Sequence, residues 1–121
     1  MAVYAELGVR TDDRVRLAID VRRRKQMMFG TGFSADPAWD ILLELYATWL
    51  EQQRISVGDL CIAARVPATT ALRWIAALER QRLIVKRCDP LDGRRVHISL
   101  SDEGLRAMVD YFATTSVLPS I

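Results

Sequence analysis

Residues 57–87 read VGDLCIAARVPATTALRWIAALERQRLIVKR, and this stretch decides the fold of the chain. Ser56 stands just before it and Asp59 follows three residues later, which is the spacing of a side-chain cap at the start of a helix. Pro67 suits the first turn of a second helix, which we expect to extend to about Arg82. The stretch therefore predicts two short helices joined by a tight turn.

The second of these helices has two different faces. The residues that follow the i, i+3, i+4, i+7 spacing of a buried stripe are Ala71, Trp74, Ile75 and Leu78. The opposite side presents Thr69, Leu72, Arg73, Ala76 and Arg80. We therefore expect Trp74 in the core and a weakly polar outer face on this helix.

A β-hairpin is predicted directly after the second helix. Its strands are the β-prone segments LIVKRC (residues 83–88) and RVHISL (residues 95–100). The turn between them is formed by Asp89, Pro90, Asp92 and Gly93. Two adjacent arginines, Arg94 and Arg95, leave this turn. Alternation along the second strand places His97 on the solvent side, so we interpret it as a surface histidine.

A helical pattern precedes this unit at the N-terminus. Thr11 followed by Asp12 indicates a helix start, and the pattern extends to Phe29, before the glycines at 30 and 32. Its basic run RRRK (residues 22–25) is interpreted as a solvated face, with direct contact to nucleic acid as the alternative.

Two further helices are predicted on either side of the motif. Residues 34–53 begin at Ser34 or Asp36, and a last helix starts after Ser101 and extends to about Thr115. Residues at helical spacing in the first of these, all expected in the core, are Trp39, Leu42, Leu43, Tyr46, Trp49 and Leu50.

The expected fold is mainly α with a small β-hairpin: a winged helix-turn-helix flanked by N- and C-terminal helices. We predict one domain over residues 1–121. Its parts are an N-terminal helix and breaker (about 12–33), the helix-turn-helix with its wing (34–100) and a C-terminal helix (101–121).

Composition excludes several classes of protein. No apolar run is long enough to cross a membrane, and the N-terminus lacks the apolar segment of a secretory signal, so a cytoplasmic protein is expected. Cys61 and Cys88 do not form a C-x-x-C pair, and we expect two reduced, mostly buried thiols. With His97 as the only histidine, we expect no metal site. No catalytic constellation or cofactor motif is present, so we predict neither enzymatic activity nor a cofactor.

Charge is strongly segregated along the chain. Residues 65–97 hold eight lysines or arginines and three acids, a net charge of +5, whereas residues 34–64 hold one arginine and five acids, a net charge of −4. A basic half that contains the second helix and the hairpin suggests a surface that faces a polyanion.

Residues 38–110 resemble the DNA-binding core of the MarR family of bacterial transcriptional regulators. The matching features occur in order: the helix-turn-helix of residues 57–82, an E-R-x-x-L-I exit, a D-x-x-D-G-R-R wing and an S-x-x-G helix start. The resemblance implies that the helix from Pro67 to about Arg82 enters the major groove of DNA. It also implies that Arg94 lies in or near the minor groove and that Asp92 steadies it.

The expected partner is double-stranded DNA, with a homodimer as the expected assembly. The residues expected at DNA are Ala68, Thr69, Thr70, Leu72, Arg73, Lys86, Arg87, Arg94 and Arg95, and those expected to support the wing are Asp92 and Gly93. A small-molecule effector stays open, since nothing in the sequence supports one, and no membrane partner is expected.

Three features depart from the family pattern. Arg65 occupies a turn position often held by glycine, so it must adopt a left-handed backbone unless the turn differs. Ala68, Leu72 and Ala76 stand where polar residues are common, and Leu72 can contact a thymine methyl group but cannot read hydrogen-bond donors. Only about 20 residues follow Ser101, which is a short tail for dimerisation. The alternative function is therefore a winged helix that binds other proteins.

Overall fold

The computed structural model describes residues 11–30, 32, 35–91 and 93–114. The elements in chain order are α2 (Thr11–Phe29), α3 (Pro37–Leu50), β1 (Ile55–Ser56), α4 (Val57–Ala63), α5 (Ala68–Arg80), β2 (Ile84–Cys88), β3 (Val96–Leu100) and α6 (Asp102–Thr114). The predicted mainly helical, winged helix-turn-helix fold is confirmed. Among the residues named above, Ser34 and Asp92 lie outside the described residues, as does the end of the predicted C-terminal segment from residue 115 onward.

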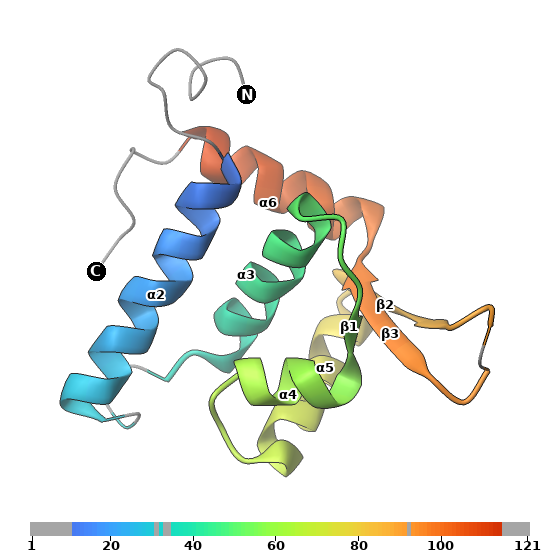
Figure 1. Ribbon diagram of the computed structural model, residues 1–121, viewed down its shortest axis with the longest axis horizontal. Coiled ribbons are helices and arrows are strands. Elements are labelled where there is room, and N and C mark those ends of the chain that lie inside the picture. Colours follow the sequence, from blue (N-terminus) through green and yellow to red (C-terminus); the bar gives the residue numbers. More distant parts are fainter. Residues whose placement is uncertain (1–10, 31, 33–34, 92, 115–121) are drawn as a thin grey trace.

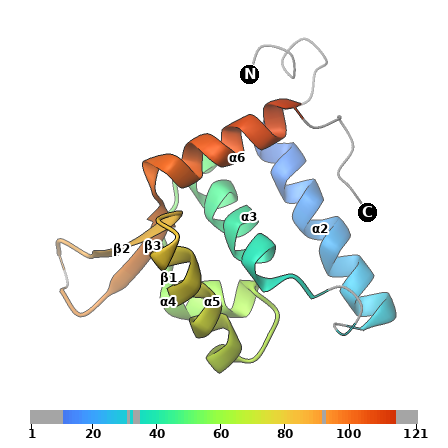
Figure 2. The same ribbon diagram turned by 180° about the vertical axis from the view of Figure 1, so that it is seen from behind.

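Helix α3 is the centre of the molecule. Figure 1 shows α2 along one side of α3, α6 across one end, and α4 with α5 at the other end. The β2–β3 hairpin projects sideways as a wing, and the view from behind shows it beside α5 (Figure 2). The terminal helices and the helix-turn-helix thus share one central helix.

The sheet contains one strand more than the sequence predicted. Its order is β1-β3-β2, and both pairs are antiparallel. Strand β1 consists only of Ile55 and Ser56, which pair with Ile98 and His97. A strand of two residues is too short for an alternating pattern, so the sequence could not reveal it.

The predicted helix caps are confirmed where the structure describes them. Asp36 Oδ1 accepts a hydrogen bond of 3.2 Å from the Trp39 amide at the start of α3. Ser56 Oγ accepts one of 3.1 Å from Asp59. Ser101 Oγ accepts one of 3.0 Å from the Gly104 amide at the start of α6. Each bond satisfies a backbone donor that the first helical turn leaves unpaired.

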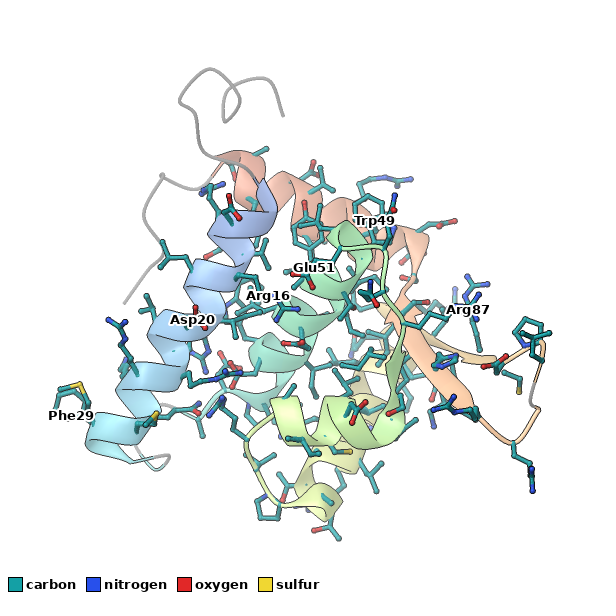
Figure 3. The ribbon with its side chains drawn as sticks, in the orientation of Figure 1. Arg16, Asp20, Phe29, Trp49, Glu51 and Arg87 are labelled. Atoms are coloured by element: carbon teal, nitrogen blue, oxygen red, sulfur yellow. The ribbon has the colours of Figure 1, made fainter. Side chains whose placement is uncertain are left out.

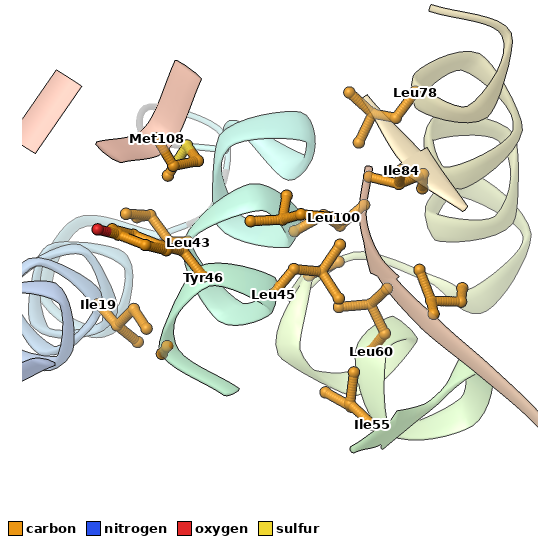
Figure 4. Close-up of a cluster of buried hydrophobic side chains, with 14 of the residues drawn as sticks. Ile19, Leu43, Leu45, Tyr46, Ile55, Leu60, Leu78, Ile84, Leu100 and Met108 are labelled. Carbon is orange, nitrogen blue, oxygen red and sulfur yellow. The ribbon is translucent and has the colours of Figure 1, made fainter. Parts of the chain in front are cut away.

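The core is continuous from α2 to the sheet (Figure 4). Its largest fully buried side chains are Tyr46, Ile41, Leu43, Leu45, Leu60, Ile75, Ile84 and Val15. Apolar side chains of both terminal helices, Val15, Ile19, Met108 and Phe112, belong to this core. These four side chains are therefore buried within the chain itself.

Two tryptophans do not take the positions expected of them. Trp74 is 42% exposed and Trp49 is 50% exposed. On α5 the buried stripe consists of Ala71, Ile75 and Leu78, so the indole of Trp74 lies at the border of that stripe. A side chain of this size at a border extends beyond the core and remains partly in solvent.

The start of α6 is fixed to the segment between α5 and β2. The Ser101 amide donates to the Leu83 carbonyl at 3.0 Å, and Ser101 Oγ donates to the Arg82 carbonyl at 2.6 Å. A Cβ atom on Gly104 would overlap the Leu83 carbonyl oxygen. The S-x-x-G pattern of residues 101–104 therefore combines a helix cap with a close backbone approach that only glycine permits.

The basic run at residues 22–25 is not simply a solvated face. Arg22 forms an ion pair with Asp40 of α3, and both side chains are largely buried. Six residues earlier in α2, Arg16 binds Glu51 at 2.6 Å and Glu44 at 3.3 Å (Figure 3). The hydrogen bond from Arg16 lowers the pKa of the Glu51 carboxyl group. These pairs attach α2 to the central helix.

The cysteines differ in their surroundings. Cys61 is buried, and burial raises the pKa of its thiol, whereas Cys88 is exposed on β2. The expectation that both thiols are mostly buried is therefore wrong for Cys88, because it lies at the end of the edge strand where the wing leaves the core. Within the described residues, no helix is both long and apolar enough to cross a membrane.

Candidate nucleic-acid interface

The outer face of α5 is open to solvent. Ala68, Thr69 and Arg73 are exposed, and Leu72 is 46% exposed. Thr70 is only partly exposed. The face is available because Ala71, Ile75 and Leu78 hold the opposite side of the helix against the core. It offers few hydrogen-bonding groups, and Arg73 is its only charge before Glu79.

The turn that leads into α5 has the left-handed geometry considered above. Arg65 has φ of 60°, and its amide donates to the Ile62 carbonyl at 3.2 Å. A residue with a Cβ atom accepts this conformation only at a cost in free energy. Arg65 thus adopts the left-handed backbone that the turn requires, although glycine would adopt it with less strain.

The wing exposes the two arginines together. Arg94 and Arg95 are both exposed, as is Gly93. The hairpin is closed by a hydrogen bond of 2.8 Å from the Asp89 amide to the Arg95 carbonyl, and Asp89 Oδ1 accepts a bond of 2.8 Å from Leu91. Gly93, expected to support the wing, does not have a positive φ. The wing is therefore shaped by Asp89 among its described residues.

Lys86 and Arg87 point to opposite faces of the sheet because they are neighbours in one strand. Lys86 lies opposite Ile98 and is 3.8 Å from Glu79 of α5. Arg87 lies opposite His97, and its Nε donates a long hydrogen bond of 3.4 Å to Ser99 Oγ. The structure thus places Lys86 beside α5 and separates Arg87 from that face.

An apolar groove adjoins the outer face of α5. It has a volume of about 360 Å3 and is lined by Val57, Gly58, Cys61, Ile62, Val66, Ala68 and Leu72. Ile62 is 77% exposed at its edge. The helical pattern in the sequence indicated an exposed Leu72 but gave no prediction for Ile62. Its position two residues after the buried Leu60 is the signal that could have shown it on the outside of α4.

Comparison with known families identifies the domain. The model of the winged helix DNA-binding domain family matches residues 41–104, which is more than half of the chain. The chain therefore belongs to the family of winged helix DNA-binding domains. Comparison with curated protein sequences finds no match.

Similar solved structures are transcription regulators. A mutant of MepR from a multidrug-resistant S. aureus clinical isolate is 28% identical, with a TM-score of 0.56, covering 66% of this chain and 56% of that one. MepR, a transcription regulator of the S. aureus multidrug efflux pump MepA, is 23% identical with a TM-score of 0.55, covering 78% and 67%. A ZitR mutant of Lactococcus lactis is 17% identical with a TM-score of 0.54, covering 64% and 49%.

These structures confirm the resemblance to the MarR family, to which MepR and ZitR belong. The chain spans only about half of the length of the mutant MepR and of ZitR.

Proposed function

We propose that the chain is a DNA-binding transcriptional regulator that inserts α5 into the major groove and holds the wing arginines at the minor groove. The observation that carries the proposal is one exposed surface formed by the outer face of α5 and the wing, in a chain of the winged helix DNA-binding family. A MepR mutant bound to an oligodeoxyribonucleotide is among the similar structures, at 23% identity.

Recognition would divide between the two elements. On α5, Thr69 and Arg73 can donate hydrogen bonds to base edges or phosphates, and Leu72 can contact the methyl group of thymine. On the wing, Arg94 and Arg95 suit a narrow minor groove, where the potential of DNA is most negative. Lys86 adds a positive charge beside α5. Arg87 lies on the other face of the sheet and does not belong to this surface.

We infer a binding protein without catalysis. Family membership points to DNA binding. The function therefore depends on the surface of α5 and the wing.

A second function is supported by the apolar groove between α4 and α5. A contiguous surface that contains Ile62 and Leu72 is also suited to a protein partner. The basic charge of residues 65–97 favours DNA, because a partner that covers only the apolar groove does not require it.

The test is a binding titration on genomic DNA fragments at two salt concentrations, with the wild type and Arg94→Ala. Loss of a groove arginine should weaken binding by about 1–3 kcal/mol and reduce the salt slope by about one unit. The matched control is Arg106→Gln, since Arg106 is exposed on α6 away from the proposed surface. Equal affinity of Arg94→Ala and wild type would remove the wing from the DNA interface. If the chain shows no saturable, salt-dependent binding to DNA, the protein-interaction function is favoured instead.

A further inference from the structure

A cavity at the base of the wing is separate from the outer face of α5. It has a volume of about 400 Å3 and lies between the last turn of α3, the segment before β1 and the strands of the wing. Small-molecule sites typically have volumes of about 300–1,000 Å3. The cavity is therefore large enough for a ligand of nucleotide size.

Its polar wall is cationic. Arg87 and His97 lie directly opposite each other on β2 and β3, and Arg54 immediately precedes β1 on the other side of β3. The hydrogen bond from Arg87 Nε to Ser99 Oγ holds the Arg87 side chain along this face. Among the described residues that line the cavity, none carries a negative charge. Two guanidinium groups and an imidazole therefore surround a space suited to an anion.

Its other wall is aromatic. Trp49 lines the cavity, is 50% exposed and stacks on Tyr46 with ring centroids 6.1 Å apart. Figure 3 shows Trp49 and Arg87 on the same side of the molecule. Leu45 and Ile98, both buried, lie beneath. An indole ring that is half exposed beside two arginines offers a stacking surface for a planar ring.

We propose that this cavity binds a small molecule in which a planar aromatic ring is joined to a phosphate group, such as a nucleoside monophosphate. The ring would stack on Trp49, and the phosphate would bind Arg54, Arg87 and His97. A phosphate monoester carries a charge of about −1.5 to −2 at pH 7, so it matches two arginines better than a single carboxylate does.

Calorimetric titration of the full chain with AMP tests the proposal. Adenosine, ribose 5-phosphate and inorganic phosphate serve as partial ligands. We expect saturable binding of AMP, with each partial ligand at least about tenfold weaker because it lacks either the ring or the phosphate. No saturable binding of AMP up to millimolar concentration would overturn the proposal, and so would adenosine that binds as tightly as AMP.

Variants locate the site. Arg54→Gln removes an exposed charge with little risk to folding, and Trp49→Leu removes the stacking surface; each should weaken AMP binding at least about tenfold. Arg106→Gln on α6 is the matched control and should bind AMP as the wild type does. If Arg73→Ala abolishes AMP binding while Arg54→Gln does not, AMP occupies the outer face of α5 and the proposal fails. Melting curves of each variant confirm that it is folded.

The exposed thiol of Cys88 provides an independent readout, since Cys88 lines the cavity and Cys61 is buried. AMP should slow the modification of Cys88 by a soluble disulfide reagent, with half-protection at the calorimetric dissociation constant. The exposed Cys88 should react faster than the buried Cys61. Loss of the fast reaction in Cys88→Ser would assign that reaction to Cys88. Binding of AMP without any protection of Cys88 would place the ligand elsewhere. None of these measurements uses DNA, so they stand or fall separately from the proposed DNA binding.

Discussion

Leu72 is the residue that most distinguishes the outer face of α5. It is 46% exposed and borders the apolar groove that also contains Ile62. A leucine in the major groove can contact the C5-methyl group of thymine but cannot bond to a base edge. We therefore expect the preferred DNA sites to contain thymine where Leu72 reaches the bases.

Replacement of that thymine by deoxyuridine tests this expectation. Loss of one buried methyl group should weaken binding of the wild type by about 0.8 kcal/mol at one or two positions of the site. In Leu72→Ala the thymine and deoxyuridine sites should bind equally, as measured by a fluorescence titration. A deoxyuridine effect of the same size in both proteins would assign the methyl contact to another residue.

Gly104 is fixed by its neighbour rather than by its own backbone angles. A methyl group at this position would overlap the Leu83 carbonyl oxygen. We expect Gly104→Ala to lower the free energy of unfolding by about 1–3 kcal/mol, because backbone must move to accept it. Urea denaturation provides the measurement.

The matched control is Gly58→Ala in α4, where a Cβ atom would come no closer than 4.0 Å to Ser56 Oγ. Alanine is favoured over glycine within helices by about 0.5–1 kcal/mol, so this variant should be neutral or stabilised. Equal destabilisation of both variants would contradict the close approach at Gly104.

At the scale of elements, the orientation of α5 decides which residues are free to bind DNA. Ile75 is 1% exposed and its neighbour Trp74 is 42% exposed. Ile75→Ala should therefore lower the free energy of unfolding by about 2–5 kcal/mol, whereas Trp74→Ala should lower it by less, because much of its indole is already in water. Thermal or urea unfolding compares the two. A larger loss for Trp74→Ala would mean that the helix is rotated about its axis relative to this structure.

The terminal helices are joined to the domain by specific contacts. Arg22 pairs with Asp40, and Arg14 donates to the Phe112 carbonyl of α6 at 2.8 Å while its guanidinium lies over the Phe112 ring. These contacts connect α2 to both α3 and α6. The flanking helices are therefore part of the folded unit that presents α5 and the wing.

At the scale of the whole molecule, we propose a homodimer. One winged helix makes few base contacts, and the outer face of α5 is weakly polar, so two copies related by symmetry would supply specificity that one lacks. The buried apolar residues of the terminal helices pack within the chain and cannot form a contact between two copies. The exposed apolar side chains of the same helices support the proposal, among them Leu17 of α2 and Tyr111 of α6.

The expected DNA site of such a dimer is an inverted repeat with half-sites one turn apart, about 10 base pairs. Sedimentation at micromolar concentration should give twice the mass of 13.7 kDa calculated for one chain. The replacement Leu17→Glu should shift the equilibrium between dimer and monomer toward the monomer, because it places a charge in the proposed contact. Ile62→Glu, on α4 and outside that contact, should leave the equilibrium unchanged. A stable monomer that protects a single half-site would reject the dimer.

The sequence by itself determined the order of the helices and of the β2–β3 hairpin, the caps at Ser56 and Ser101 and the two faces of α5, since these depend on neighbours a few residues apart. It also singled out Arg65 as a turn position often held by glycine, and the structure then showed the left-handed backbone there. Tertiary structure alone decided how far Trp49 and Trp74 are exposed, that Arg22 pairs with Asp40, and that Lys86 and Arg87 serve different faces. It also brought Trp49, Arg54, Arg87 and His97 to one cavity. The physical reason is that burial and charge pairing depend on segments distant in the chain, whose approach leaves no period or spacing in the sequence.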